Sequence, residues 1–202
     1  MLRDERVART DTCFFGILDR SSGFSLIELL VTIVVTSLLL GMAIPGFSNM
    51  VARNELAVST NAVRGALMVA REAAIMRGQP VSLCAGDPDE GCSGNWASGQ
   101  WIVFRDSNHS GDLDNTEALL DHDRVPGIGQ RVSIEGNGPL RSALVYMPLG
   151  HAERPSGAFG AGRLRICVES SDVSPNAREL IVSSSGRVRA RRVDFGGLCP
   201  SL

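Results

Sequence analysis

The longest apolar stretch of the chain lies near its amino terminus, between residues 24 and 44. Within it only Glu28 carries a charge. As an α-helix, a segment of this length rises about 31 Å, enough to cross the ~30 Å hydrocarbon core of a bilayer. The pattern therefore predicts a membrane-spanning helix. Glu28 is a candidate functional residue, because an ionised carboxylate inside hydrocarbon is costly unless it finds a partner.

The apolar pattern changes after Pro45, where we expect an amphipathic helix that continues to residue 77. Its apolar residues recur with the 3.6-residue period of one helix face, at Leu56, Val63, Leu67, Ala70 and Ala74. Gly78 and Pro80 follow Arg77, which is the signal expected where a helix ends.

Beyond Pro80 the pattern changes to short β-rich runs between turns rich in Gly, Asp and Ser. These runs are 81–84, 101–104, 118–120, 132–134, 143–146, 164–168, 179–183 and 187–193. Short runs that follow one long helix favour an α+β fold, in which an antiparallel sheet or two small sheets lie against the helix. Trp96 and Trp101 are expected to be core or loop anchors.

The residues around Gly23 indicate how the apolar helix is used. If the chain were cut after Gly23, the new amino group on Phe24 would lie one turn from Glu28, and the same group on a neighbouring subunit could pair with that carboxylate. This arrangement resembles the class III signal and N-terminal helix of type IV pilins and pseudopilins. The residues that carry the resemblance are Gly23, Phe24, Leu26, Ile27, Glu28, Leu29 and Leu30, with Ser25 in place of the commoner Thr.

The resemblance implies that prepilin peptidase removes residues 1–23 and methylates Phe24, and that Glu28 serves assembly. Residues 1–22 have no apolar run, so they are not a Sec-type leader, and Cys13 would leave with them. Arginines before the helix place the following domain outside the cytoplasm, although four acids dilute that signal. We therefore expect a single-pass inner-membrane protein with a periplasmic domain, which enters a filament after processing. A generic anchor and an uncleaved cytosolic tail are the alternatives.

Two further segments narrow the resemblance. AREAAIMRGQPVSLC (70–84) and CSGNWASGQWIVFRD (92–106) resemble the GspH/FimT family of minor pilins and pseudopilins. The likeness covers roughly residues 23–120 well and the remainder only in outline. It implies a leader over 1–23, a transmembrane helix over 24–45, its amphipathic continuation over 46–78 and a β-rich periplasmic domain over 79–202.

The same resemblance implies partners. These are other pilins or pseudopilins along the helix, prepilin peptidase and the inner membrane. Phe47, Met50 and Val51, on roughly the opposite face from the apolar series, would suit packing on other subunits. A simple membrane-proximal stalk is the alternative. Pro45 falls where pilins break their helix.

Four cysteines remain after the leader: Cys84, Cys92, Cys167 and Cys199. An even number in an exported domain indicates two disulfides, for which three pairings are open. We favour Cys84–Cys92, which closes a short loop, and Cys167–Cys199, which ties the last strand region to an earlier one. Zinc is not favoured, because no C-x-x-C pair or nearby His supports it.

Charge is unevenly distributed, although the formal net charge is only −2. Residues 87–123 hold nine acids and only Arg105, whereas residues 124–202 hold eleven Arg and six acids. This asymmetry suggests a basic surface that is reserved for a partner.

Residues 106–117 fit the calcium-loop pattern of alternating oxygen ligands around a glycine. The matching residues are Asp106, Asn108, Ser110, Gly111, Asp112, Asp114 and Glu117, with Ser110 the one departure. However, Val103 and Phe104 lead in as a strand, so the helix-loop-helix frame of that pattern is missing. A calcium site and a solvated acidic loop both stay open, and the second is favoured.

The basic run after Ser185 gives the sharpest functional hypothesis. It consists of Gly186, Arg187, Arg189, Arg191 and Arg192, with Val188 and Ala190 between them. In a strand the odd-numbered arginines share one face, while Val188 and Ala190 face the core, and no acid lies between Glu179 and Asp194. Such arginines can contact successive phosphates and bind double-stranded DNA without sequence preference. An edge strand on which arginine discourages aggregation is the alternative.

Gly186, Arg187 and Arg189 also match the Gly-Arg-x-Arg motif of FimT proteins, which are implicated in DNA uptake during natural transformation. The favoured function is therefore a DNA-binding minor pilin of a type IV pilus. The main alternative is a GspH-like minor pseudopilin, a structural tip subunit of type II protein secretion. No cofactor or catalytic constellation is expected, because His109, His122 and His151 are scattered in polar loops. A membrane-tethered enzyme would need a clustered active site.

Overall fold

The computed structural model describes residues 23–125 and 131–202. The chain divides into two compact units, Met1–Met42 and Ala43–Leu202. One helix, α1 (Leu26–Arg77), contributes residues to both. Most of the expected leader, residues 1–22 with Cys13, lies outside the described residues.

In the first unit, the start of α1 is set by Ser25. Its side-chain oxygen accepts a hydrogen bond from the backbone N–H of Glu28 at 3.3 Å, which is the usual action of an N-cap serine. The apolar side chains that follow are exposed, from Leu26 at 83% to Leu40 at 56%. Among the described residues, α1 is the one helix long and apolar enough to cross a membrane.

The helix is continuous through position 45, so the break that the resemblance led us to expect at Pro45 is not seen. A proline inside a helix removes one backbone hydrogen bond, and the turns on either side keep theirs. The boundary between the two compact units falls close to Pro45 in the sequence, between Met42 and Ala43.

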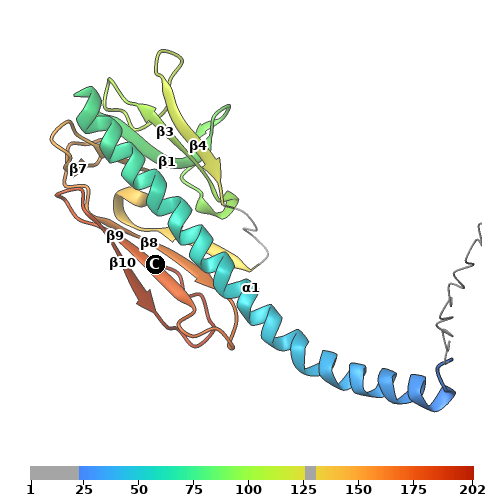
Figure 1. Cartoon of the computed structure of the whole chain (residues 1–202). Coiled ribbons are helices and arrows are strands. Elements are labelled where there is room, and N and C mark those ends of the chain that lie inside the picture. The colour runs from blue at the N-terminus through green and yellow to red at the C-terminus, as the bar shows by residue number, and fades with distance from the viewer. Residues whose placement is uncertain (1–22, 126–130) are drawn as a thin grey trace, which may run out of the picture. The chain divides into compact units, whose positions relative to one another are not determined.

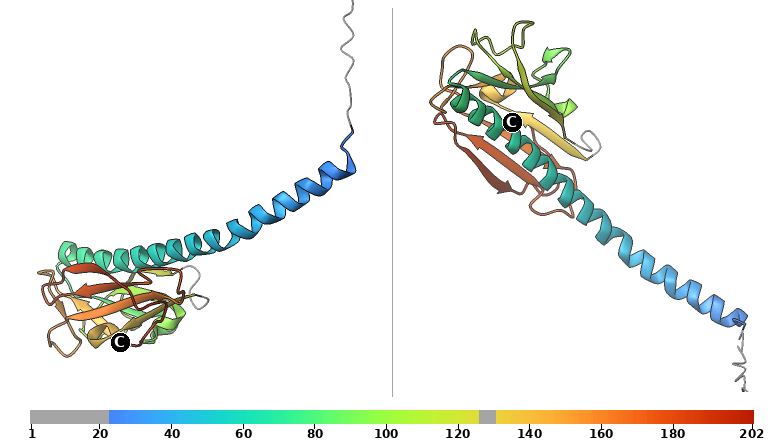
Figure 2. Two further views of the ribbon diagram at one scale, coloured as in Figure 1. Left: turned by 90° about the horizontal axis from the view of Figure 1, so that it is seen from below. Right: turned by 45° about the horizontal axis from the view of Figure 1, so that its top comes forward.

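In the second unit, two antiparallel sheets lie against the helix (Figures 1 and 2), as expected for the α+β fold. The larger has the order β4-β3-β1-β6-β7, with β2 paired to β1, and the smaller has the order β10-β9-β8-β5. The strands of the larger sheet are β1 (Val81–Asp87), β2 (Gly91–Cys92), β3 (Gln100–Arg105), β4 (Leu119–Arg124), β6 (Ala143–Tyr146) and β7 (Ala152–Glu153). Those of the smaller sheet are β5 (Val132–Gly136), β8 (Gly162–Val168), β9 (Ala177–Val182) and β10 (Val188–Val193). Two short 3-10 helices, η1 (Trp96–Ser98) and η2 (Gly138–Arg141), connect them.

The helix packs on the sheets through the face that the sequence predicts. Its five predicted core residues, Leu56, Val63, Leu67, Ala70 and Ala74, are all buried. They join alternate residues of β8 and β9, among them Leu164, Ile166 and Leu180, in one apolar cluster. Phe47 and Met50 are exposed, at 69% and 70%. The helix ends at Arg77, and Gly78 takes the left-handed conformation with φ of 63°.

Both tryptophans are buried anchors, as predicted. Trp96 and Trp101 are each 3% exposed, and the indole N–H of Trp96 donates to the carbonyl oxygen of Leu140 at 2.7 Å. This bond connects η1 to η2, so it fixes two connections that otherwise have little regular structure.

Two disulfides are present in the second unit, with the pairing that the sequence favoured. Cys84–Cys92 joins β1 to β2, and Cys167–Cys199 joins β8 to the C-terminal tail. The tail therefore lies over the outer face of the smaller sheet, the face opposite to the helix. There the guanidinium of Arg165 lies 4.4 Å from the centre of the Phe195 ring and donates to the carbonyl oxygen of Pro200 at 2.6 Å.

Candidate nucleic-acid interface

The predicted basic strand is β10, the outermost strand of the smaller sheet. Its hairpin with β9 pairs Arg189 with Ile181, Arg191 with Glu179 and Arg192 with Arg178. Because side chains alternate along a strand, Arg189 and Arg191 share the outer face of the sheet, and Arg192 lies on the helix side. The exposed residues of the run are Arg187, Arg189, Ala190, Arg191 and Arg192.

One detail of that strand differs from the prediction. Val188 packs against the apolar cluster as expected, but Ala190 is exposed. On an edge strand the small alanine side chain does not reach the covered part of the core. The apolar side of β10 is therefore limited to its first residue.

Gly186 has a structural reason that the sequence does not reveal. It is buried, its φ is 74°, and a Cβ at this position would overlap the carbonyl oxygen of Gly150. Its N–H donates to the carbonyl oxygen of Ser183 at 2.8 Å, which closes the turn between β9 and β10. Gly186 thus sets the path of the chain into Arg187 and offers no side chain to a ligand.

Arg71 of α1 holds this turn against the helix. Its Nε donates to the carbonyl oxygen of Gly150 at 2.8 Å, and its Nη2 donates to that of Ser185 at 3.4 Å. No pattern in the sequence marks Arg71 as a functional residue. Its separation from Ser185 is 114 residues, so only the folded chain brings the two together.

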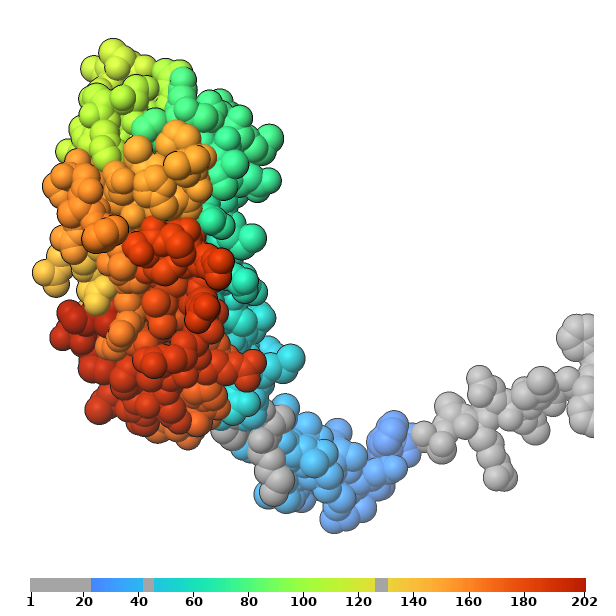
Figure 3. Space-filling model, turned by 90° about the vertical axis from the view of Figure 1, so that its left-hand side faces the viewer, coloured from blue at the N-terminus to red at the C-terminus, as the bar shows by residue number. Residues whose placement is uncertain are grey.

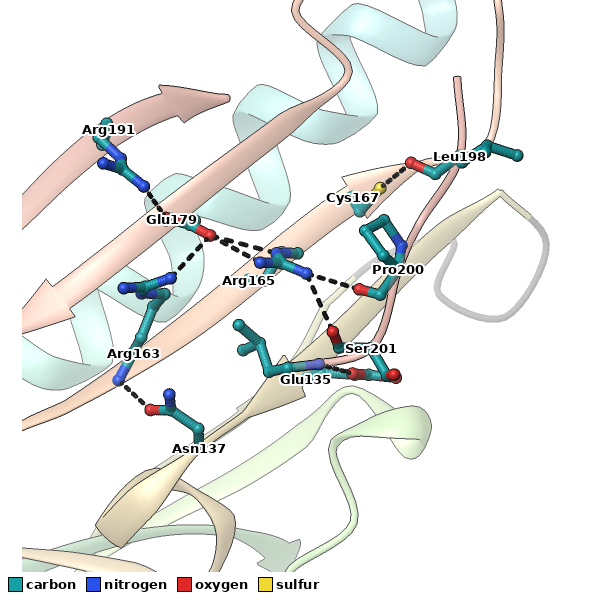
Figure 4. A network of polar contacts seen from close by, with 11 residues as sticks. Glu135, Asn137, Arg163, Arg165, Cys167, Glu179, Arg191, Leu198, Pro200 and Ser201 are labelled. Atoms are coloured by element: carbon teal, nitrogen blue, oxygen red, sulfur yellow. Dashed lines mark hydrogen bonds and ion pairs between the residues drawn. The ribbon is translucent and has the colours of Figure 1, made fainter. Parts of the chain in front are cut away.

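Glu179 is the centre of an ion-pair network on the outer face of the smaller sheet (Figure 4). It is 1% exposed, and its carboxylate accepts from Arg165 at 2.9 Å, Arg191 at 2.8 Å and Arg163 at 3.4 Å. Burial acts to raise the pKa of Glu179, but the hydrogen bonds from Arg165 and Arg191 outweigh it and hold the pKa below its ordinary value.

The network corrects the view that no acid neutralises the arginine run. Glu179 lies outside the run in sequence, yet it faces Arg191 directly across the hairpin. A sequence signal for this pair exists, because the two residues are equidistant from Ser185 in the turn. Arg191 is therefore engaged within the protein.

The other arginines of the basic run have no such partner in the described part of the chain. Among residues 23–125 and 131–202, no ion pair involves Arg187, Arg189 or Arg192. Arg178, which is opposite Arg192, has its pKa lowered by burial and then by repulsion from Arg192. Positive charge on this edge is thus uncompensated, a condition that favours an anionic ligand.

The acidic loop behaves differently. Asp106 is fully buried, and its carboxylate accepts hydrogen bonds from Ser82 Oγ at 2.5 Å and from the N–H groups of Ser110 and Gly111 at 2.9 Å. Asn108 donates to Asp114 at 3.0 Å, and Glu117 accepts from the N–H of Ser107 at 2.7 Å.

In these bonds the side-chain oxygens of the loop accept hydrogen bonds from the protein itself, mainly from the backbone N–H groups of the loop. In the part of the chain that the structure describes, no group of three or more His, Cys, Asp or Glu side chains is arranged to hold a metal. The exposed carboxylate of Asp112 makes no hydrogen bond to the described residues. The geometry is that of a hydrogen-bonded acidic loop.

The structure brings two of the scattered histidines together. His151 Nε2 lies 2.9 Å from Glu153 Oε1, and His109 Nε2 lies 3.8 Å from Glu153 Oε2. His122 is exposed on β4 and does not take part. Glu153 belongs to β7, and His109 belongs to the acidic loop, so the contact between them joins that loop to β7.

The predicted processing site lies at the start of the described chain. Gly23 and Phe24 precede α1 and are exposed. Glu28 is the acidic residue of the first helical turn, and no ion pair among the described residues involves it. Its carboxylate is therefore not satisfied by any described residue of its own chain.

Two family models match the chain. Residues 59–186 match the model described as type II transport protein GspH, and residues 18–44 match the prokaryotic N-terminal methylation motif. The first match extends well past residue 120, where the likeness seen in the sequence fades. No curated protein matches the chain.

Solved structures of low sequence identity are similar in part. A crystal structure of the type IV minor pilin FimU of Pseudomonas aeruginosa is 18% identical, with a TM-score of 0.49 over 69% of this chain and 90% of that one. The minor pseudopilin EpsH from the type 2 secretion system of Vibrio cholerae is 12% identical, with a TM-score of 0.44 over 68% and 97%. At these values neither similarity bears on function. The GspH model, in contrast, spans more than half of the sequence, and the protein therefore belongs to the GspH family.

Proposed function

We propose that this protein is a minor pilin of a type IV pilus that binds DNA through β10. In this proposal residues 24–45 span the inner membrane, residues 46–78 continue the helix, and residues 79–202 form a periplasmic domain. Prepilin peptidase removes residues 1–23 and methylates Phe24. The match of residues 18–44 to the methylation motif and the exposed apolar side chains of the first unit support the anchor. The proposal contains no catalytic step.

Glu28 is assigned to assembly. An uncompensated carboxylate in hydrocarbon is costly, and the amino group of Phe24 from a neighbouring subunit would neutralise it. Intact mass and N-terminal sequencing of protein purified from cells test the first step, with methylated Phe24 expected as the first residue. A chain that still begins at Met1 would overturn both the processing and the pairing.

DNA binding rests on one observation: exposed, unpaired arginines on a sheet edge. Arg187 and Arg189 have no ion-pair partner among the described residues. A guanidinium group binds phosphate strongly, because it can donate two parallel hydrogen bonds to two phosphate oxygens. Binding through phosphates is independent of sequence, and it weakens as salt rises because counterions are released. DNA drawn inward by a retracting pilus is the ligand in this proposal.

The test is binding of a fluorescent duplex to the full-length chain in uncharged detergent, read by anisotropy over a range of salt. Arg187→Gln with Arg189→Gln removes two phosphate contacts, so the slope of log K against log salt should fall by about 2. Arg53→Gln with Arg77→Gln is the matched control, since both residues are exposed on α1 and the loss of charge is equal. Equal behaviour of the two double variants would refute DNA binding by β10.

Arg191 gives an internal comparison in the same assay. Because Glu179 holds its guanidinium at 2.8 Å, Arg191→Gln should weaken binding less than Arg189→Gln does. The two residues lie on the same face of the same strand, so the difference isolates the effect of the internal partner.

A second candidate function is a minor pseudopilin of type II secretion. The description of the matching family model, type II transport protein GspH, favours it. Deletion of the gene separates the two functions. Loss of DNA uptake with normal protein secretion supports the pilus, and loss of secretion with normal DNA uptake supports the pseudopilus.

A further inference from the structure

A groove of about 370 Å³ lies between α1 and the start of β10. Its helix wall is formed by Arg64, Met68 and Arg71, and its other wall by residues 186–189. The space-filling view shows the C-terminal strand and the helix side by side along this border (Figure 3). The groove therefore joins a surface of the helix to the strand that carries the predicted DNA contacts.

The helix wall has a regular origin in the sequence. Arg64, Met68 and Arg71 follow one another at intervals of four and three residues, so they lie on one face of α1. Arg64 and Arg71 are separated by about 10.5 Å along the helix axis. Arg71 is held by the carbonyl oxygens of Gly150 and Ser185, whereas Arg64 is exposed.

The charge of the groove is one-sided. Four arginines line it, namely Arg64, Arg71, Arg187 and Arg189, and no acidic residue does. No ion pair among the described residues involves any of the four. Glu72 is next to Arg71 in the chain, but adjacent helical residues do not face the same way. Like charges gathered in one concave place repel one another, and a bound anion relieves that repulsion.

We infer that this groove holds the sugar-phosphate backbone of a nucleic acid, and that Arg64 is a phosphate contact supplied by the helix. The inference rests on the proposed DNA binding and deepens it. A chain of phosphates in the groove meets Arg187 from one wall and Arg64 from the other, and it continues over the edge of the sheet to Arg189, whose side chain lies on the outer face. A concave groove with cations on both walls suits a polymer strand better than the flat surface of a lipid bilayer.

Arg64→Gln tests the inference in the full-length chain, with the duplex anisotropy assay. Loss of one charged hydrogen bond to phosphate should lower the affinity roughly tenfold. The salt slope should fall by about 0.9, the value for one phosphate contact. Arg53→Gln is the matched control, an exposed arginine of the same helix outside the groove, and should leave both quantities unchanged. Both variants are expected to fold, because neither side chain makes a hydrogen bond to the described residues. Thermal unfolding of each variant checks this.

Each outcome decides something different. If the Arg187→Gln, Arg189→Gln variant loses affinity and Arg64→Gln does not, DNA binding stands and the helix contact is refuted. If neither loses affinity, the proposed function itself fails. If Arg64→Gln leaves duplex binding intact but weakens binding to vesicles that contain anionic phospholipid, the groove is a lipid site and the inference is overturned.

Discussion

The acidic loop at residues 106–117 and the basic strand at residues 186–193 are the two charged segments that the sequence offers as binding sites, and the fold treats them in opposite ways. In the loop, the carboxylate of Asp106 is buried and accepts three hydrogen bonds from its own chain. In the strand, Arg187 and Arg189 are exposed and have no ion-pair partner among the described residues. Charge density alone therefore does not identify a binding site, because what matters is whether the protein already satisfies that charge.

The strand itself contains the same contrast on a smaller scale. Arg191 is tied to the buried Glu179, and Arg189, two residues away on the same face, is not. Glu179 thus separates arginines that stabilise the sheet from arginines that remain available to a ligand. Substitutions at Glu179 and in the acidic loop test this division between charges satisfied inside the protein and charges left for a ligand.

The largest effect is expected from removal of Glu179. Glu179→Ala leaves Arg165, whose side chain is 10% exposed, without its carboxylate, and Arg163 and Arg191 lose the same partner. Breaking a buried ion pair in this way should lower the free energy of unfolding by about 4 kcal/mol. Denaturant unfolding of the full-length chain, followed by tryptophan fluorescence, measures it.

Glu169→Ala is the control for that change, because Glu169 is exposed just beyond the end of β8. Its loss should alter the free energy of unfolding by no more than about 0.5 kcal/mol. Similar values for the two variants would mean that Glu179 does not organise the network.

A somewhat smaller effect is expected in the acidic loop. Asp106→Ala leaves the buried hydroxyl of Ser82 and the buried N–H of Gly111 without their acceptor, while the N–H of Ser110 keeps the side-chain oxygen of Asn108. Unpaired buried donors should cost about 3 kcal/mol of unfolding free energy. Asp112→Ala is the matched control, because Asp112 is exposed in the same loop and its side chain makes no hydrogen bond to the described residues. A stable Asp106→Ala protein would show that the loop does not depend on its internal bonds.

The difference between these two regions could be anticipated only in part from the sequence. Periodicity and β-propensity are local signals. They predict the buried helix face, and each of the eight predicted strand runs overlaps a strand of the structure. β2 and β7 have two residues each, too few to show any pattern. The burial of Asp106 depends on Ser82, which is 24 residues away, and the hold of Arg165 on the tail depends on Pro200, 35 residues away. Contacts of this kind are set by sheet register, which a single sequence does not fix.

The division also predicts a pH dependence with a definite sign. Since the folded pKa of Glu179 is lowered, the stability that its charge supplies is complete above the unfolded value of about 4.3 and is lost as pH falls through the lower folded value. The difference in unfolding free energy between wild type and Glu179→Gln should therefore be constant above about pH 5 and shrink only in stronger acid. A difference that already shrinks on the way down from neutral pH would indicate a raised pKa and an unpaired carboxylate.

The smallest effect is expected from calcium, the ligand that the pattern of the acidic loop suggests. Both oxygens of Asp106 and the side-chain oxygen of Asn108 already accept backbone or hydroxyl protons, so an ion would have to displace those bonds before it gained its own. Calcium at a hundred times its dissociation constant would add about 2.7 kcal/mol to a protein that binds it. We expect no such gain, and therefore no shift of Tm in circular dichroism relative to an equal concentration of magnesium. If calcium, but not magnesium, raised the Tm and Asp114→Asn abolished that rise, the loop would be a calcium site. The contrast between the loop and β10 would then be wrong.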